Sequence, residues 1–176
     1  MMKNRLKTIR AFAFDIDGVA TDGGVFCNSD GDLLRTYDAK DGFAIRMAVM
    51  HGYPVAVITG GSSESIRKRM VTSGIPADDV YLHCRDKRVQ FKEFCQKHNL
   101  EPQDVMYFGD DVPDIDVLKA AGIGVCPSDA VDEVQAIADW VSDFPGGKGC
   151  LRDSIEKTLR AQDNWTFNPD TYKKLF

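Results

Sequence analysis

The sequence predicts an α/β protein of three layers, in which helices cover both faces of a central parallel sheet. Strand-like and helix-like segments alternate along the chain, as in βαβ units. Several strand-like segments are apolar throughout, as expected for parallel strands that are buried on both faces. Acidic or hydroxyl side chains follow three of these segments, and sites in open parallel sheets lie at the carboxyl ends of the strands.

The first apolar segment, residues 9–14, predicts a buried strand that runs directly into two acids. Residues i and i+2 of an extended chain point to the same side, so Asp15 and Asp17 can face one spot. Charge is unfavourable there unless a cation or a reaction uses it. Gly18 follows, where the chain must turn or let a group approach the backbone closely.

The elements after this strand follow from local patterns. Two short apolar runs around an Asp-Gly turn predict a β-hairpin over about residues 25–37. The pair Asp41-Gly42 leads into a helix over 43–50, which Gly52 stops. We expect further strands at 55–59, 80–82, 105–108, 123–126 and 140–141, and further helices from Ser63 as cap to about 74, over 87–98, around 115–122, at 130–138 and along 151–159.

Length, net charge and cysteine content limit the number of domains, the partners and the location to be expected. The length of 176 residues suits one domain, expected over 1–162, followed by a polar tail with interspersed aromatic residues over 163–176. The net charge of −5 argues against nonspecific binding to nucleic acid or an anionic membrane, and no stretch reads as a signal peptide or a membrane span. The five cysteines form no CxxC pair, which favours a reducing, cytoplasmic location over a disulfide framework.

Four motifs stand in a fixed order. The segment 15–19 with 21–23 resembles the first motif of the haloacid dehalogenase (HAD) superfamily of phosphatases, and three further pieces match its later motifs: Thr59 after a strand, Lys87 at the start of a helix, and Asp110-Asp111 with Asp114 after another strand. The resemblance implies a Rossmann-like α/β/α fold. A single DxD would be weak evidence, but four motifs in order are a specific signal.

The resemblance also implies roles for these residues. Asp15 would attack phosphorus and form an aspartyl-phosphate, and Asp17 would protonate the leaving oxygen and then activate water. Thr59 and Lys87 would bind phosphoryl oxygens. The implied Mg²⁺ ligands are the Asp15 carboxylate, the Asp17 backbone carbonyl and the Asp110 carboxylate, with Asp111 and Asp114 orienting the waters of the metal.

Structural alternatives stay open for two of these residues. Asp114 stands at a helix start, where an acid often serves only as a cap. Lys87 is one of several cations in 85–88 and could instead be an ordinary surface charge on a helix. The histidines show no metal spacing, and Cys95 and Cys126 are expected to be buried and inert.

The spacing between motifs predicts a phosphatase without a cap domain. About forty residues separate Asp17 from Thr59, and the hairpin and one helix use them. A small phosphate ester needs a covered site, so the hairpin is a candidate lid in place of a cap. The hairpin is too small and too apolar to stand alone, which predicts a homo-oligomer, most simply a tetramer, whose protomers share lids; packing on its own domain is the alternative.

A finer resemblance covers residues 9–162. The segments 38–42 and 146–152, with Arg46 and Arg69, are similar to those of the 3-deoxy-D-manno-octulosonate 8-phosphate (KDO 8-phosphate) phosphatases, tetrameric capless enzymes of lipopolysaccharide sugar synthesis. An arginine pair suits a substrate with a carboxylate and a phosphate. The resemblance implies that the substrate is bound by Asp17, Asp38, Ala39, Lys40, Asp41, Gly42, Arg46, Thr59, Gly60, Arg69 and Lys87.

The chain departs from this pattern at one position, where many relatives have arginine and this chain has Gly61. One cationic contact is therefore missing, and a nine-carbon 2-keto-3-deoxy acid 9-phosphate is an alternative substrate. A non-catalytic binding module with the same fold is the alternative of another class, although the complete motif set favours an enzyme. A protein phosphatase with an open site is a third, weaker reading.

Overall fold

A computed structural model describes residues 2–168 of the chain. Within these residues the main sheet has six parallel strands in the order β5-β4-β1-β6-β7-β8. The strands are β1 (Ala11–Phe14), β4 (Val55–Ile58), β5 (Val80–Tyr81), β6 (Val105–Phe108), β7 (Ile123–Cys126) and β8 (Trp140–Val141). The predicted fold class is confirmed, and β1 lies in the middle of the sheet with β4 and β6 on its two sides.

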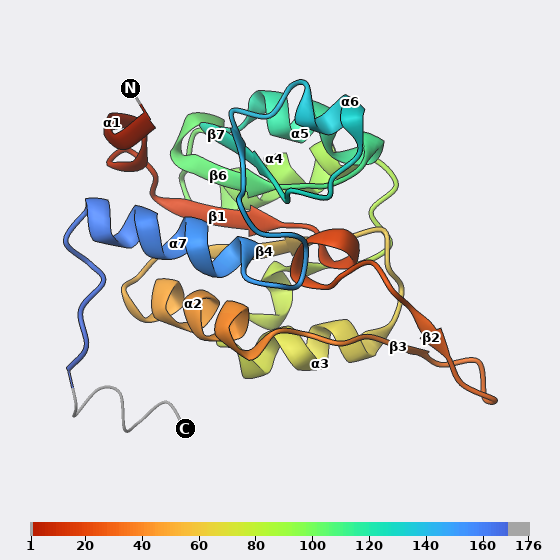
Figure 1. The fold of residues 1–176 in the computed structure, drawn as a ribbon. Coiled ribbons are helices and arrows are strands. Elements are labelled where there is room, and N and C mark those ends of the chain that lie inside the picture. The colour runs from red at the N-terminus through yellow and green to blue at the C-terminus, as the bar shows by residue number, and fades with distance from the viewer. Residues whose placement is uncertain (1, 169–176) are drawn as a thin grey trace.

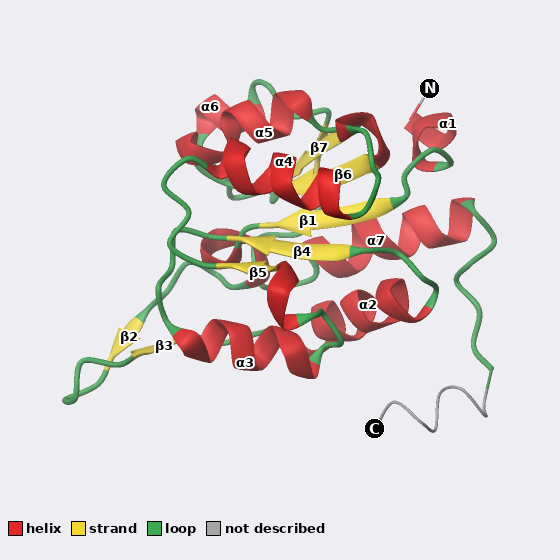
Figure 2. Ribbon diagram, turned by 180° about the vertical axis from the view of Figure 1, so that it is seen from behind, coloured by secondary structure: helices red, strands yellow, loops and turns green. Residues whose placement is uncertain are grey.

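Helices cover both faces of this sheet (Figures 1 and 2). One face carries α2, α3 and α7, and the other carries α4, α5 and α6. The helices are α1 (Met2–Leu6), α2 (Ala39–Met50), α3 (Glu64–Thr72), α4 (Lys87–Lys97), α5 (Ile115–Ala120), α6 (Asp132–Gln135) and α7 (Cys150–Ala161). The molecule therefore has the three layers that the alternation of segments predicts.

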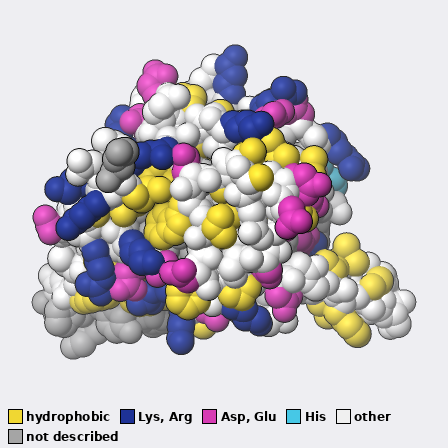
Figure 3. All heavy atoms as spheres, turned by 45° about the horizontal axis from the view of Figure 1, so that its top comes forward, with side chains coloured by type: hydrophobic (Ala, Val, Ile, Leu, Met, Phe, Trp, Pro, Cys, Tyr) yellow, Lys and Arg dark blue, Asp and Glu magenta, His cyan; other side chains and the backbone are white. Residues whose placement is uncertain are grey.

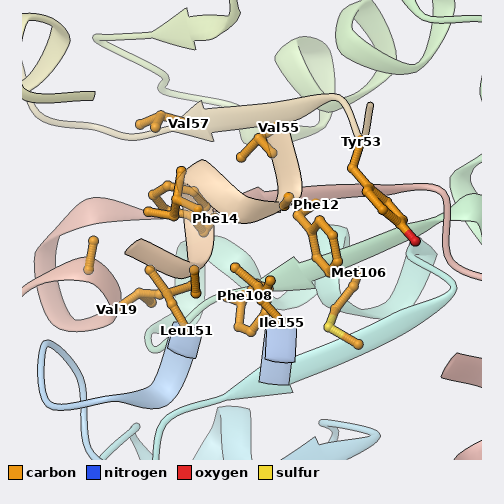
Figure 4. Close-up of a cluster of buried hydrophobic side chains, with 14 of the residues drawn as sticks. Phe12, Phe14, Val19, Tyr53, Val55, Val57, Met106, Phe108, Leu151 and Ile155 are labelled. Carbon is orange, nitrogen blue, oxygen red and sulfur yellow. The ribbon is translucent and has the colours of Figure 1, made fainter. Parts of the chain in front are cut away.

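The alternation of side chains along β1 divides the core in two. Phe12 and Phe14 point toward α2 and α7, where they meet Leu151 and Ile155 (Figure 4). The small side chains that alternate with them, Ala11 and Ala13, face α4 and α5 on the opposite side. All four residues of β1 are fully buried, as a strand covered on both faces should be. Removing a side chain of this size from a core typically costs about 3–5 kcal/mol of folding free energy.

The predicted hairpin is present. Its strands β2 (Phe26–Cys27) and β3 (Leu33–Leu34) pair antiparallel and project from the body of the molecule. Apolar side chains gather on this projection (Figure 3), among them Phe26, whose surface is 67% exposed, and Leu34, which is 49% exposed. The hairpin therefore does not bury its apolar side chains against its own protomer.

Several element boundaries differ from those expected. The helix expected over 43–50 begins at Ala39, because the Asp38 side chain caps it by accepting hydrogen bonds from the amides of residues 40 and 41. Ser63 stands at the start of α3 but makes no capping bond, since its hydroxyl pairs with Ser65. The helix expected at 130–138 is reduced to α6, because the chain turns at Asp139 to hydrogen-bond Gly124 of β7.

The first residues of the C-terminal tail lie on the face of α2 and α7. Trp165 is buried, and its ring meets Phe43 edge-on at 6.2 Å between centroids. The Arg152 guanidinium lies over both rings, at 4.8 Å from Trp165 and 5.3 Å from Phe43. Tyr172 and Phe176, two further aromatic residues of the same tail, lie outside the described residues.

Candidate active site

The carboxyl ends of the three central strands bring the motif residues together. Asp15 follows β1, Thr59 follows β4 and Asp110 follows β6. The amide of Asp15 donates a hydrogen bond to Phe108 of β6 at 3.0 Å, and the amide of Thr59 donates to Tyr81 of β5 at 3.1 Å. These bonds continue the sheet beyond its last paired residues, so the functional side chains begin where a rigid scaffold ends.

Asp15 is a buried carboxylate with one oxygen held by the backbone. Its Oδ1 accepts from the amide of Ile16 at 2.7 Å, and its Oδ2 lies 2.7 Å from the Nζ of Lys87. Burial raises the pKa of the Asp15 carboxyl, and the ammonium of Lys87 opposes that rise without cancelling it. The position suits a nucleophile, because the carboxylate is fixed in direction by two donors.

Lys87 connects two acids from different parts of the chain. It is the first residue of α4, and its Nζ lies 2.7 Å from Asp114 Oδ1 as well as from Asp15. Tyr107 Oη, buried in β6, donates to the same Asp114 oxygen at 2.5 Å. Burial lowers the pKa of Lys87, but the two carboxylates outweigh it and the pKa is raised, so the lysine stays charged.

The burial of Lys87 decides between the two readings that the sequence left open, a site residue or a surface charge. The side chain is 5% exposed, which excludes the reading as a solvated surface charge. Asp114 is fully buried, and its other oxygen accepts from the amide of Asp110 at 3.3 Å. Asp114 therefore does more than cap the start of a helix: it holds the lysine and the loop after β6.

Three of the acids form a cluster that fits a metal ion. Carboxylate oxygens of Asp15, Asp110 and Asp114 lie within 4.8 Å of one another, and Asp110 Oδ1 is buried without a hydrogen-bond partner among residues 2–168. Burial raises the pKa of Asp110 to about 7, and the negative charges of Asp15 and Asp114 contribute. A divalent cation with hard oxygen ligands, such as Mg²⁺, would relieve this crowding and occupy the orphaned oxygen.

Gly18 is required for this cluster to form. Its φ is +86°, and a Cβ at this position would lie 2.0 Å from Asp110 Oδ2. The chain turns tightly over Ile16–Ala20, which the amide of Thr21 closes by donating to the carbonyl of Ile16 at 3.0 Å. The glycine thus lets the loop after β1 approach the loop after β6.

Asp17 carries a partner that the sequence did not predict. Arg35, just after β3, donates from Nε to Asp17 Oδ1 at 2.6 Å and from a terminal nitrogen to Oδ2 at 2.9 Å. The predicted contribution of the Asp17 backbone carbonyl to a metal stays a prediction. A single charge within the apolar run 33–37 was the signal that could have drawn attention to Arg35.

Two further motif residues lie in the loops around this cluster. Thr59 is buried, and its hydroxyl accepts from the amide of Gly61 at 3.1 Å, which folds the loop that also contains Gly60. Asp111 is exposed, and its carboxylate accepts from the amide of Val112 at 2.7 Å. Asp111 therefore organises the turn before α5, and its predicted role toward metal-bound water remains a prediction.

The residues predicted to bind the sugar acid form a second cluster, between α2 and α3. Tyr37, Asp38, Gly42 and Arg69 line one small cleft there, with Ala39 and Lys40 in the first turn of α2. The Arg69 guanidinium lies 5.7 Å from the centre of the Tyr37 ring and donates to the Ser73 hydroxyl at 3.2 Å.

The two remaining residues of this set are held by neighbouring backbone. Arg46 donates to the backbone carbonyl of Thr72. The Asp41 carboxylate accepts from the amides of Gly149 at 3.2 Å and Arg152 at 2.7 Å, so it caps the first turn of α7. Burial raises the pKa of Asp41 to about 6. Asp41 therefore joins α2 to α7, whatever else it contacts.

The fold and this rim define a class of protein. The central strands of the parallel sheet end in a lysine-bound aspartate, a buried hydroxyl and an acid cluster, which are the features that the resemblance to the HAD superfamily implies. The family model of haloacid dehalogenase-like hydrolases matches residues 44–149.

Known proteins narrow this class. The KDO 8-phosphate phosphatase of Escherichia coli strain K12 is 32% identical over 158 residues, which cover 90% of this chain and 83% of that protein. The crystal structure of the same enzyme from Yersinia pestis superposes with a TM-score of 0.89 at 31% identity, covering 92% of this chain and 86% of the other. The Moraxella catarrhalis enzyme, solved in complex with a magnesium ion, a phosphate ion and KDO, gives a TM-score of 0.89 at 28% identity over 98% and 96% of the two chains.

The chain therefore belongs to the haloacid dehalogenase-like hydrolases, in the family of the 3-deoxy-D-manno-octulosonate 8-phosphate phosphatases. The family resemblance predicted from the four motifs is confirmed.

Proposed function

We propose that this chain is a Mg²⁺-dependent phosphatase that hydrolyses KDO 8-phosphate to KDO and inorganic phosphate through an aspartyl-phosphate on Asp15. The observation that carries the proposal is the Asp15–Lys87 pair at 2.7 Å beside the cluster of Asp110 and Asp114. The likeness to the Moraxella catarrhalis enzyme, solved with magnesium, phosphate and KDO, supports the choice of substrate and cation.

The residues of the rim divide the chemistry among them. The free electron pair of Asp15 attacks phosphorus, the bond from phosphorus to the ester oxygen breaks, and Asp17 gives that oxygen a proton. In the second step water attacks phosphorus and Asp17 takes a proton from the water. The bond from phosphorus to the Asp15 oxygen breaks, which releases inorganic phosphate and restores the Asp15 carboxylate. Lys87 and the Thr59 loop bind the phosphoryl oxygens while charge builds on them.

The Asp15 carboxylate, the Asp17 backbone carbonyl and the Asp110 carboxylate would hold Mg²⁺ close to these groups, with Asp111 and Asp114 orienting its waters, and the clustering of Asp15, Asp110 and Asp114 supports a cation at this place. When bound, the cation supplies positive charge to the phosphoryl oxygens, which lowers the repulsion between the anionic ester and the anionic nucleophile. Gly18 leaves the space for this approach, since any side chain there would displace Asp110.

The remaining predicted residues extend the proposal to the sugar acid. The cluster of residues 38–42 with Arg46 and Arg69 would bind its carboxylate and hydroxyls, and Arg69 already faces Gly42 and Tyr37 across the α2–α3 cleft.

The exposed apolar hairpin supports a homotetramer in which each hairpin covers a neighbouring site. No helix within residues 2–168 is long and apolar enough to cross a membrane. We propose a cytoplasmic location, which the five free cysteines of the described part support.

The test is phosphate release from a panel of sugar-acid phosphates, with and without Mg²⁺. The proposal predicts the highest kcat/KM on KDO 8-phosphate and loss of turnover after chelation with EDTA. A higher kcat/KM on a nine-carbon 2-keto-3-deoxy acid 9-phosphate would change the substrate and keep the reaction. Turnover of phosphoproteins alone would indicate an open-site protein phosphatase. Absence of turnover on every ester would favour the non-catalytic binding module.

A further inference from the structure

Arg35 is a buried cation at the foot of an otherwise exposed hairpin. Its side chain is 4% exposed, although the strands before it carry apolar side chains on the surface. The guanidinium is held at one end by the carbonyl of Leu33, 3.4 Å away, and at the other by both oxygens of Asp17. Because desolvating an arginine is costly, a buried guanidinium in a site for anions calls for a role beyond hairpin packing.

The guanidinium bridges two loops of the active site. It binds Asp17 in the loop after β1, and its terminal nitrogen lies 3.5 Å from the place where a Cβ on Gly61 would stand, in the loop after β4. Thr59, expected to bind a phosphoryl oxygen, is two residues away and lies 3.4 Å from that same Cβ position. Arg35 therefore lies next to the loop that would receive the phosphate, on the space that Gly61 leaves open.

The geometry of the ion pair leaves Asp17 engaged. Both carboxylate oxygens accept a hydrogen bond from the fork of the guanidinium, at 2.6 and 2.9 Å, so the pair fixes the direction in which the Asp17 carboxylate points. For Asp17 to reach the leaving oxygen of an ester, this pair has to open. A phosphate group presents the same two-oxygen geometry as a carboxylate and more negative charge, so it can replace Asp17 as the partner of Arg35.

We propose that Arg35 is a substrate-contacting residue that exchanges Asp17 for the phosphate of the incoming ester, so that binding of the substrate itself frees Asp17 for catalysis. This inference rests on the proposed function, since it assigns a role at the same site. It also accounts for the departure at Gly61: the hairpin supplies from position 35 the positive charge that position 61 lacks. The hairpin thereby serves its own site through its foot, and its exposed tip is left for other contacts.

The test measures binding of inorganic phosphate, in the presence of Mg²⁺, by isothermal titration calorimetry. Arg35→Ala is expected to weaken phosphate binding about tenfold or more, because a charge-assisted hydrogen bond is lost. Arg35→Lys keeps the charge without the fork and is expected to lie between Arg35→Ala and wild type. Arg10→Ala is the matched control: it removes an exposed arginine that pairs with Asp104, and it should bind phosphate as wild type does.

A relocated charge separates substrate contact from hairpin structure. The double variant Arg35→Ala with Gly61→Arg puts a guanidinium on the Thr59 loop, where the new Cβ meets only the flexible end of Ile66 at less than 3 Å. It is expected to regain part of the phosphate affinity without restoring the link between hairpin and Asp17. In turnover assays, Arg35→Ala should raise the inhibition constant of phosphate and lower kcat/KM together.

Two results would overturn the inference: phosphate affinity of Arg35→Ala within twofold of wild type, or a double variant that recovers nothing while circular dichroism shows a native fold. Failure of the proposed function is a different result. Wild-type protein that hydrolyses no ester would remove the enzyme assignment, while the phosphate-binding comparison between wild type and Arg35→Ala would still decide the role of Arg35.

Discussion

At the scale of single residues, Lys87 sets the charge balance of the site. Its ammonium lies 2.7 Å from both Asp15 and Asp114, whereas the buried oxygen of the third acid, Asp110, has no hydrogen-bond partner in the part of the chain that the structure describes. One cation thus faces three carboxylates. Burial is the main cause of the raised pKa of Asp15 and of Asp110, and repulsion between the carboxylates adds to it. The site is built to receive another positive charge.

Asp15→Asn is expected to reduce turnover by a factor on the order of 10³ or more, because the amide cannot attack phosphorus. The fold should be unaffected, since Asn keeps an oxygen for the amide of Ile16. Steady-state phosphate release measures the loss, with mass spectrometry to exclude deamidation back to Asp. Asp132→Asn, at an exposed position on α6, is the control and should turn over normally. Near-normal activity of Asp15→Asn would refute the aspartyl-phosphate mechanism.

The raised pKa of Asp110 predicts how the free energy of unfolding of the metal-free protein depends on pH. Its carboxyl keeps a proton to about pH 7 in the folded chain, while its ordinary pKa is 3.8. The folded state then binds more protons than the unfolded state between these values, so the free energy of unfolding falls as pH rises through this window. Mg²⁺ binds the ionised form, and its stabilisation should therefore grow as pH rises.

The measurement is the shift of Tm on adding Mg²⁺, at about pH 5.5 and about pH 8. We expect the larger shift at the higher pH in wild type. In Asp110→Ala we expect little shift at either pH, with a metal-free Tm no lower than that of wild type, because one of the crowded carboxylates is gone. An equal Mg²⁺ shift in the variant would show that the cation binds elsewhere.

At the scale of elements, the joint between α2 and α7 depends on one buried acid. Asp41 of α2 accepts from two amides at the start of α7, and burial raises its pKa to about 6. The ionised form is the less stable one in the fold, so this group costs folding free energy as pH rises from about 4 to 6.

Asp41→Asn should lose one of these two bonds, because its NH₂ group cannot accept from an amide, but its stability relative to wild type is expected to rise across this window by an amount on the order of 1–3 kcal/mol. Urea unfolding at several pH values measures the difference. Asp38→Asn is the matched control, since Asp38 caps α2 through amides of its own helix and Asn is an equally good cap. A difference between Asp41→Asn and wild type that stays constant with pH would contradict the prediction.

The helices and strands also show which features of the fold and site can be predicted from the sequence. Strands such as β6 are found at the predicted residues, because complete burial demands an unbroken apolar run. The start of α2 and the end of α6 were misplaced, because a side-chain cap at Asp38 and a long-range bond from Asp139 decide them. Asp15, Thr59 and Asp110 could be placed at one rim by the strand-end rule. No such rule pairs Arg35 with Asp17, because a side chain that reaches out of a hairpin leaves no periodic trace.

At the scale of the whole molecule, the hairpin predicts assembly. Phe26 and Leu34 are exposed on a two-stranded hairpin that does not bury them against the rest of the described chain. Phe26→Asp is expected to dissociate the oligomer and leave the circular dichroism spectrum and monomer fold intact. Sedimentation velocity at micromolar concentration measures the mass. Val71→Asp, at a similarly exposed position on α3, should keep the mass of wild type.

Mixing experiments then test whether lids are shared between protomers. A site variant, Asp15→Asn, and a deletion of the hairpin tip that keeps Arg35 should each be inactive alone, and mixed oligomers should recover part of the activity. Absence of recovery, once subunit exchange has been demonstrated, would contradict the shared lid. A fully active monomer of wild type would contradict the assembly itself.

The place of β1 in the middle of the sheet has a consequence for biosynthesis. Its partner on one side, β6, comes some ninety residues later, since Ala11 pairs with Val105 and Phe14 with Phe108. While the ribosome makes the intervening chain, one edge of a fully apolar strand has no partner and is open to pairing with another nascent chain. The same delay keeps Asp110 and Asp114 from Asp15 until more than half of the protein has been synthesised, so no nascent fragment that ends before β6 can possess the acid cluster.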